Sequence, residues 1–404
     1  MLKFKKHNTL LACLLTMLCT LMVQNTKAQP NAPDIVVAQD GSGKFTSIQE
    51  AVLSVRDYKP SRTIIYVKNG RYEEKLHIPA NKCDITIIGQ SQTGVVITHS
   101  DYAKLNNMGT FNTWTVRVDG DGIRMENLTI ENAAGAVGQA VALHVEGDRC
   151  EFAKCRILGN QDTVFNGRGG SRQYFSNCYI EGTTDFLFGP ATVVMDMCQL
   201  HCKANSYITA ASTPENQPFG YVLRQCKITT AEGVDRLFLG RPWRAFAAVT
   251  FLKCEMPKAI VPQGWHDWGQ TENQGTARYA EIASQGPGAN DTARVAWAKT
   301  IGQCVWEGNQ TCPNMESQAP RDTNHNEPIG PTCPKGKKLT LKKIFRDWRP
   351  IYANALCENQ PNMPNSKEHK VGYEYGKQNV KGAKAKDGDK KGDKKGGKKE
   401  TKKG

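Results

Sequence analysis

Four short runs of the sequence carry the side chains best suited to chemistry. They are Gln139-Ala140-Val141-Ala142-Leu143, Gln161-Asp162-Thr163, Gly182-Thr183-Thr184-Asp185-Phe186-Leu187-Phe188-Gly189 and Leu239-Gly240-Arg241-Pro242-Trp243. Two carboxylates accompanied by two carboxamides suit the hydrolysis of an ester by an aspartate nucleophile. The guanidinium and the indole suit a carboxylate and the face of a sugar ring. The sequence therefore indicates an acidic polysaccharide ester as the substrate.

Each step of ester cleavage has a candidate residue. Asp185 is the candidate nucleophile, and Arg241, if it lies within a few Å, holds it ionised and lowers its pKa. A second carboxylate nearby tends to keep its proton, so Asp162 is the candidate acid that protonates the leaving methanol and the base that then activates water. Gln139 and Gln161 are the candidate donors to the oxyanion.

Aromatic side chains in these runs are candidates for the floor of a substrate groove. Trp243, together with Phe165 and Phe186, is expected to stack on sugar rings, whose C–H faces are apolar. Each signal is weak when taken alone, because an Asp after Gln or an Arg before Pro is most often a turn residue or a solvated side chain. The order of the four runs, taken together, is stronger evidence for this chemistry than any one of them.

A cysteine recurs in similar contexts along the middle of the chain. The series is Cys155, Cys178, Cys198, Cys226 and Cys254, separated by 23, 20, 28 and 28 residues, and Asn127 extends it backward by another 28. A period in the twenties marks a solenoid. Each unit supplies a short strand that cannot bury its inner face alone, so the units must stack into a parallel β-helix. The recurring Asn or Cys is expected to form a ladder at a turn inside the stack.

The cysteines invite two interpretations. Reduced, packed thiols are favoured for the ladder, because unpaired Cys is among the most buried residue types, although a neighbouring pair such as Cys198 and Cys202 could still bridge. Outside the ladder, four cysteines lie in a Pro- and Asn-rich stretch and are the best disulfide candidates, with their connectivity open. They are Cys304, Cys312, Cys333 and Cys357.

The solenoid needs a cover at each end. The apolar residues of 45–52 are spaced for one helical face, which predicts a capping helix before the first strands at 63–67 and 85–88. The period is lost after Arg294-Val295-Ala296-Trp297. Residues 339–356 have a mixed basic and apolar pattern, which predicts one helix that packs on the solenoid or binds a partner.

The N-terminus resembles a secretory signal peptide over residues 1–28. Three lysines precede an apolar stretch from Leu10 to Val23, which falls short of the ~20 residues needed to span a bilayer. We therefore expect a secreted or periplasmic protein without a stable membrane span. The remaining segments are predicted as a β-helix domain over 29–300, a Cys-containing extension over 301–366 and a disordered Lys/Gly-rich tail over 367–404.

The net charge of +14 overstates how basic the folded part is. Residues 1–28 contribute +4 and residues 381–404 contribute +7, which leaves about +3 for the rest. A nucleic-acid-binding protein would gather its basic residues on a folded face, so no nucleic-acid partner is expected. The basic tail is read as solvating, with electrostatic contact to a polyanion as the alternative.

The order of the four runs resembles the pectin methylesterase family, and the resemblance covers roughly residues 33–300. Gly70-Arg71-Tyr72-Glu73-Glu74 matches an early strand motif, while Gly286-Pro287-Gly288-Ala289 and Arg294-Val295-Ala296-Trp297 match the end. The resemblance implies an all-β fold, a single-stranded right-handed parallel β-helix. It also implies that Asp185 is the nucleophile and Asp162 the acid and base. Asn160 and Thr184 depart from the residues common in the family.

The roles implied for the remaining site residues are the same as those expected above. Gln139 and Gln161 carry over as oxyanion donors, and Arg241 and Trp243 as substrate contacts. The implied partner is methyl-esterified pectin, acted on by a monomer. No metal and no organic cofactor are expected, because no histidine pairs with the cysteines at zinc spacing.

Three other functions share parts of this pattern. A pectate lyase or a polygalacturonase would use the same solenoid and polymer, but neither explains the paired glutamines. A non-catalytic polysaccharide-binding surface protein would keep the aromatic residues but would not need both Asp162 and Asp185. The pair of aspartates favours an enzyme.

Overall fold

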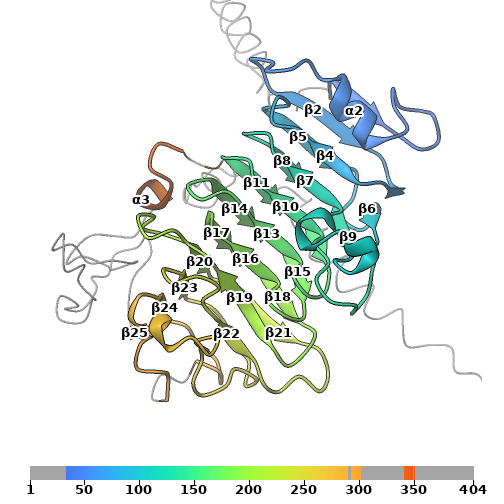
Figure 1. Cartoon of the computed structure of the whole chain (residues 1–404). Coiled ribbons are helices and arrows are strands. Elements are labelled where there is room, and N and C mark those ends of the chain that lie inside the picture. Colours follow the sequence, from blue (N-terminus) through green and yellow to red (C-terminus); the bar gives the residue numbers. More distant parts are fainter. Residues whose placement is uncertain (1–32, 290–292, 302–340, 349, 351–404) are drawn as a thin grey trace, which may run out of the picture. The chain divides into compact units, whose positions relative to one another are not determined.

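The chain winds into a stack of parallel coils. The computed structural model describes residues 33–289, 293–301, 341–348 and 350. Successive coils contribute one strand each to three parallel sheets, so neighbours in a sheet come from consecutive turns of the chain (Figure 1). This is the predicted right-handed parallel β-helix, whose crossovers have the hand that parallel strands favour.

The strands of each sheet are given in their spatial order. Sheet 1 is β1 (Ile35–Val37), β2 (Thr63–Val67), β5 (Ile85–Gly89), β8 (Arg124–Glu126), β11 (Cys150–Ala153), β14 (Arg172–Ser176), β17 (Thr192–Asp196), β20 (Tyr221–Arg224), β23 (Ala248–Leu252), β24 (Arg278–Ile282) and β25 (Lys299–Ile301). Sheet 2 is β3 (Gly70–Glu73), β6 (Val95–His99), β9 (Thr129–Asn132), β12 (Arg156–Leu158), β15 (Tyr179–Gly182), β18 (Gln199–Cys202) and β21 (Lys227–Thr230). Sheet 3 is β4 (Leu76–Ile78), β7 (Val116–Val118), β10 (Leu143–Val145), β13 (Val164–Asn166), β16 (Leu187–Gly189), β19 (Tyr207–Ala211) and β22 (Phe238–Gly240).

The core fills the space enclosed by the three sheets. Because side chains alternate across a strand, every second residue points inward and meets its equivalent on the next coil. In β2, for example, Thr63, Ile65 and Val67 are buried while the residues between them are half-buried. The same alternation turns the other set of side chains outward, and on sheet 3 that outer face carries the site described below.

The predicted cysteine ladder is present and its thiols are unpaired. Cys155, Cys178, Cys198, Cys226 and Cys254 are all buried and free. Each thiol lies 3.3 to 3.7 Å from a backbone carbonyl of the preceding coil, to which it donates a weak hydrogen bond. Cys202 is also free, so the alternative of a bridge between Cys198 and Cys202 is wrong.

The expected extension of the ladder to Asn127 is wrong by one residue. Arg156 pairs with Thr129, so Leu128, which is fully buried, is the residue below Cys155. Asn127 instead occupies the position of Lys154, and both adopt a left-handed backbone with φ of 58° and 52°. Asn tolerates this conformation better than most residues do, which explains why an Asn stands beside the ladder rather than in it.

A short helix covers the N-terminal end of the stack, as predicted (Figure 1). The helix α2 (Ile48–Ser54) buries Ile48, Ala51 and Val52, whose spacing places them on one face. The Glu74 carboxylate accepts hydrogen bonds from the Ile48 and Gln49 N–H groups at 2.9 and 3.1 Å. It thereby satisfies two free donors at the positive end of the helix. The 3₁₀ turns are η1 (Leu105–Asn107), η2 (Thr110–Asn112) and η3 (Thr271–Gly275).

The C-terminal part departs from two expectations. The strand β25 follows Trp297 and pairs with β24, so the repeat continues one strand beyond the expected end. The helix expected over 339–356 is shorter in the structure, where α3 spans Leu341–Phe345. Leu341, Ile344 and Phe345 pack on the outer face of sheet 1, as the packing interpretation predicted. They form one buried cluster with Tyr174, Val194, Val222, Leu252 and Ile282.

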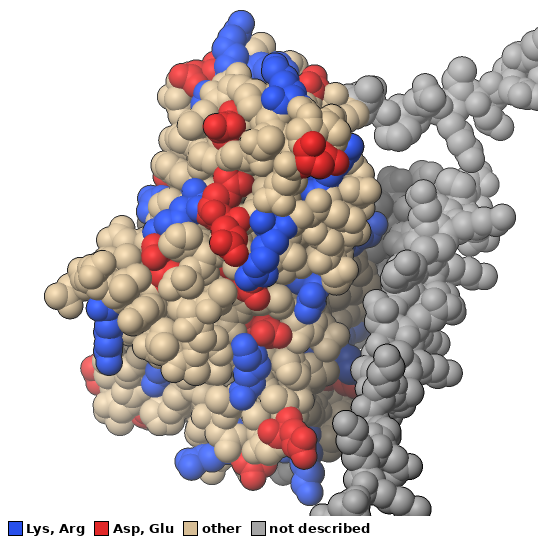
Figure 2. All heavy atoms as spheres, turned by 90° about the vertical axis from the view of Figure 1, so that its right-hand side faces the viewer, with Lys and Arg blue, Asp and Glu red and all other residues tan. Residues whose placement is uncertain are grey.

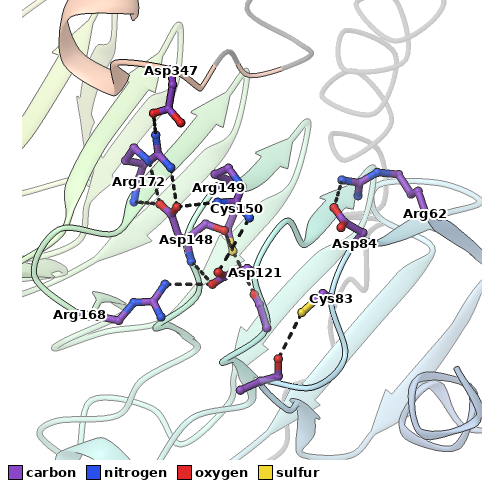
Figure 3. Close-up of polar contacts among 12 residues, drawn as sticks. Arg62, Cys83, Asp84, Asp121, Asp148, Arg149, Cys150, Arg168, Arg172 and Asp347 are labelled. Atoms are coloured by element: carbon purple, nitrogen blue, oxygen red, sulfur yellow. Dashed lines mark hydrogen bonds and ion pairs between the residues drawn. The ribbon is translucent and has the colours of Figure 1, made fainter. Parts of the chain in front are cut away.

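An ion-pair network attaches this segment to the coils (Figure 3). The Arg172 guanidinium donates to Asp148 at 2.6 and 2.9 Å, to Asp347 at 2.6 Å and to the Phe345 carbonyl at 2.9 Å. Arg172 and Asp148 are both largely buried, so the pair is shielded from screening by salt. Residues 341–348 therefore form a clasp that is held by apolar packing and by charge.

Several predictions concern residues outside the described part of the chain. These are the signal peptide, the disulfide candidates Cys304, Cys312, Cys333 and Cys357, and most of the segments 301–366 and 367–404. The domain boundaries stay predictions.

On the face shown in Figure 2, acidic and basic side chains of the described residues are interspersed, without a continuous patch of one sign. No helix within the described ranges is long and apolar enough to cross a membrane.

Candidate active site

The two aspartates singled out in the sequence lie at equivalent positions of neighbouring coils. Val164 pairs with Leu187, and the Asp162 N–H continues this ladder by donating to the Thr184 carbonyl at 3.0 Å. This register places Asp162 beside Asp185, each two residues before a strand of sheet 3. The two carboxylates are therefore brought to the same edge of the sheet.

Both aspartates adopt an unusual backbone conformation. Their φ angles are 65° for Asp162 and 50° for Asp185, in the left-handed region that non-glycine residues seldom occupy. Such residues cost roughly 1–3 kcal/mol each and are concentrated at functional sites. The left-handed residue interrupts the alternation of the strand, so the residue that follows each aspartate, Thr163 or Phe186, is buried completely.

Asp185 is paired with Arg241, as predicted. The guanidinium Nε and Nη2 atoms lie 3.0 and 2.6 Å from the two carboxylate oxygens, a two-point contact that holds both groups in one plane. The Asp185 side chain is only 6% exposed. Burial raises the pKa of Asp185, and the hydrogen bonds and charge of Arg241 oppose this rise without reversing it. Arg241 therefore lowers this pKa, as expected, but the net shift is upward because desolvation outweighs the pairing.

Asp162 has a different environment. No hydrogen bond from another described residue reaches its carboxyl group, which is largely buried. Burial, and secondarily the negative charge of Asp185, raise the pKa of Asp162 to about 8, against a smaller opposing effect of Arg241. Asp162 therefore holds its proton at neutral pH while Asp185 ionises first. This separation matches the roles of acid and nucleophile expected from the sequence.

The two glutamines lie next to each other and next to this pair. Gln139 and Gln161 form a parallel bridge between their coils, and both side chains are half-buried. Neither side-chain amide donates a hydrogen bond to another of the described residues. Both amides are thus free to donate to an oxygen atom above Asp162, where the negative charge of a tetrahedral intermediate would develop.

An aromatic surface lies on the outer face of sheet 3. Phe165 and Phe188 follow the two aspartates on β13 and β16, with ring centroids 4.9 Å apart. Trp243 lies 5.9 Å from Phe188. Phe111 on η2 lies 4.9 Å from Phe165 and is 43% exposed. The arrangement brings Phe165 and Trp243 together, as the sequence predicted.

Phe186 does not belong to this surface. Its side chain is fully buried in the main core, so the expectation that Phe186 stacks on a sugar is wrong. Phe188, two residues later, is the ring that faces outward. The sequence analysis named Phe186 and not Phe188. The left-handed backbone of Asp185 breaks the alternation of the strand, so Phe186 turns into the core and Phe188 turns to the outer face.

Two further aromatic residues near Arg241 were not predicted. The guanidinium carbon lies 3.9 Å from the ring centroid of Tyr207 and 3.6 Å from that of Trp268. Tyr207 begins β19, and its carbonyl accepts the Asp185 N–H at 2.8 Å. Trp268 lies in a loop after β23. Nothing in the sequence around Trp268 distinguishes it from an ordinary loop tryptophan.

Known proteins resemble this chain over the span that holds the site. The family model described as Pectinesterase matches residues 34–307. Pectinesterase 31 of Arabidopsis thaliana is 38% identical over 276 residues, which are 66% of this chain and 86% of that protein. The probable pectinesterase/pectinesterase inhibitor 19 of the same plant is 34% identical, and the match spans 54% of its length.

Solved structures agree with these matches. The pectin methylesterase from carrot superposes with a TM-score of 0.65 at 33% identity, covering 68% of this chain and 90% of that one. The pectin methylesterase from Aspergillus niger gives a TM-score of 0.61 at 30% identity, covering 69% and 93%. The matched span contains every residue of the site. By its sequence, its coiled fold and these matches, the chain belongs to the pectinesterase family.

Proposed function

We propose that this protein hydrolyses the methyl esters of galacturonate units in pectin, giving pectate and methanol. Its relatives are pectinesterases and pectin methylesterases, which are carboxylic ester hydrolases. The observation that carries the proposal is the asymmetric pair of aspartates. One of them is paired with Arg241, and the pKa of the other rises to about 8. Such a pair offers a nucleophile and an acid at the same pH.

The first half of the reaction forms an acyl-enzyme. An oxygen of ionised Asp185 attacks the ester carbonyl carbon, and the carbonyl oxygen becomes an oxyanion that Gln139 and Gln161 stabilise by hydrogen bonds. The intermediate collapses by breaking the bond to the methoxy group. Protonated Asp162 gives its proton to that oxygen, so methanol leaves and a mixed anhydride with Asp185 remains.

The second half restores the enzyme. Asp162, now ionised, takes a proton from a water molecule as the water oxygen attacks the anhydride carbonyl. The same two amides stabilise the new oxyanion by hydrogen bonds. Its collapse releases the Asp185 carboxylate, which pairs again with Arg241. The product acid ionises to pectate. Asp162 ends the cycle protonated, as it began.

The polymer is proposed to bind over the aromatic surface of sheet 3. Trp243, which is partly exposed, and Phe111 offer apolar faces for the C–H faces of the sugar rings, while ester and hydroxyl groups point toward Asp185 and the amides. Phe165, expected to stack on the sugar as well, is only 7% exposed and packs against Phe111. Arg241 was expected to contact substrate as well. Two of its three guanidinium nitrogen atoms are engaged with Asp185, so its main role is proposed to be holding the nucleophile.

Methanol release from highly methylated pectin tests the proposal. The wild-type protein should release methanol and the Asp185→Asn variant should not, because an amide cannot form the acyl-enzyme. Unsaturated products absorbing in the ultraviolet would indicate a lyase, and new reducing ends a polygalacturonase. Binding of pectin without any product would support a non-catalytic polysaccharide-binding protein.

The remaining expectations concern location and partners. We propose that residues 1–28 direct secretion or periplasmic export, that the mature protein acts as a monomer, and that no metal or cofactor takes part. The basic tail is proposed to contact polyanions such as pectate. Deleting residues 381–404 should weaken retention on immobilised pectate at low salt, with little effect at high salt where such contacts are screened.

A further inference from the structure

The Arg241 guanidinium lies against two aromatic rings. The guanidinium carbon lies 3.9 Å from the ring centroid of Tyr207 and 3.6 Å from that of Trp268. At these distances the planar cation is attracted to both rings. Asp185 meets the guanidinium at the Nε and Nη2 atoms.

Each of these two rings has its own support. Behind Tyr207, the Phe238 ring is stacked at 5.2 Å with an angle of 23° between the planes. The imidazole of His266 meets both of these rings edge-on at 5.4 Å. Phe238 belongs to β22 and lies three residues before Arg241. The ring that supports Tyr207 and the guanidinium that contacts Tyr207 therefore come from one strand and the turn after it.

Trp268 is held by a polar contact with the same imidazole. Its backbone N–H donates to His266 Nδ1 at 2.9 Å. Trp268 also has a φ of 65°, a left-handed conformation that a bulky residue adopts only where its surroundings impose it. Nδ1 accepts this bond through its lone pair, so a ring hydrogen of His266 is carried on Nε2.

We propose that Tyr207 and Trp268 fix the plane of the Arg241 guanidinium against Asp185, and that His266 is the positioning residue that keeps Trp268 in place. This inference rests on the proposed function, since it concerns the ionisation of the proposed nucleophile. It assigns the three residues a role that acts through Arg241 rather than by contact with the sugar.

The inference has a specific consequence for the reaction. Without Trp268, the long Arg241 side chain gains freedom and its edge spends less time against Asp185. The carboxylate is then stabilised less in its ionised form, so the pKa of Asp185 rises further, and the nucleophile is available only at higher pH. A residue that merely provided a surface for a sugar ring would affect substrate affinity instead.

The test compares pH profiles of kcat/KM for pectin. In Trp268→Leu and in His266→Leu, the acidic limb should move to higher pH by about one unit, and kcat at pH 6 should fall about tenfold. KM should change little. His266→Asn should keep most of the wild-type behaviour, because its Oδ1 stands near the position of Nδ1 and can accept the same N–H.

Two further variants make the comparison specific. Tyr179→Leu removes an aromatic ring that lies 5.5 Å from Arg156 and is stacked on His201, a similar assembly on sheet 2, and its acidic limb should not move. Trp243→Leu should raise KM without moving the limb. The proposal is overturned if Trp268→Leu also raises only KM, or if His266→Asn behaves like His266→Leu.

A measurement independent of pectin separates this proposal from the proposed function. The carboxyl carbon of Asp185 is titrated by ¹³C NMR in protein labelled at Asp, with Asp185→Asn for the assignment. Its titration should move to higher pH in Trp268→Leu, whether or not pectin is hydrolysed. An unchanged titration would overturn the positioning role, and a shifted titration in a protein inactive on pectin would reject only the substrate.

Discussion

Asp162 and Asp185 stand at equivalent positions of adjacent coils, yet only Asp185 is paired with a cation. Both carboxyl groups are buried and both have raised pKa values, but the rise for Asp162 reaches about 8 because no hydrogen bond from a described residue offsets its burial. One repeat unit thus holds the proposed acid and the next the proposed nucleophile, from the same residue type in the same backbone conformation.

This difference predicts the alkaline side of the pH profile. Asp162 must carry a proton when methoxide leaves, so kcat should fall as the pH rises through about 8. The rate of methanol release at saturating pectin, measured between pH 6 and 10, shows this fall in kcat. A kcat that stays constant up to pH 10 would assign the proton to another group.

Asp162 should also make folding stability depend on pH. Below the usual pKa of 3.8 both the folded and the unfolded chain hold this proton, and between 3.8 and about 8 only the folded chain does. The contribution of Asp162 to stability therefore becomes more unfavourable as the pH rises through that window, by up to about 6 kcal/mol. Asp162→Asn should have the same melting temperature as the wild type near pH 4 and a higher one at pH 8. The exposed Asp235, changed to Asn, is the control and should show no such trend.

The two glutamines should act on the transition state. Gln139→Ala and Gln161→Ala should each lower kcat about 10²–10³-fold and leave KM almost unchanged, because the amides meet an oxyanion that exists only during the reaction. Gln199→Ala, on an exposed position of sheet 2, should keep wild-type kinetics. A large increase in KM with normal kcat would instead assign the amides to ground-state binding.

The thiols of the cysteine ladder should be inert in the folded protein. Burial raises the pKa of Cys178, Cys198 and Cys226 well above the usual value, so the reactive thiolate is scarce and inaccessible. After brief treatment with iodoacetamide, mass spectrometry should find these peptides unlabelled and the partly exposed Cys83 labelled. Labelling of the ladder before Cys83 would contradict the packing described here.

The repeat was predictable from sequence because a buried cysteine recurs with a nearly constant period. The exact register was not, since the left-handed position beside the ladder is occupied by Asn127 and Asn177 in two coils but by Lys, Met or Gln in others, namely Lys154, Met197, Gln225 and Lys253. Those three residue types give no sign of a left-handed backbone. The shape of the turn is imposed by the stacked coils around it.

The composition of the site was predictable only where chemistry and sequence order agree. Both aspartates, both glutamines and Arg241 could be named because their combination is rare. Tyr207 and Trp268 could not, because their importance arises from contacts with Arg241 across 34 and 27 residues of chain. The net upward shift of the Asp185 pKa was also missed, because the extent of its burial depends on the coils above and below.

The clasp has a consequence for how the molecule opens. A stack in which each coil contacts only its neighbours can fray from an end, one coil at a time. The apolar residues of α3 belong to one buried cluster with side chains from β14, β17, β20, β23 and β24, so they add packing on the outside of these coils. Asp185 lies between β14 and β17 in the sequence. The proposed nucleophile therefore lies in a part of the stack that this additional packing stabilises against local fraying.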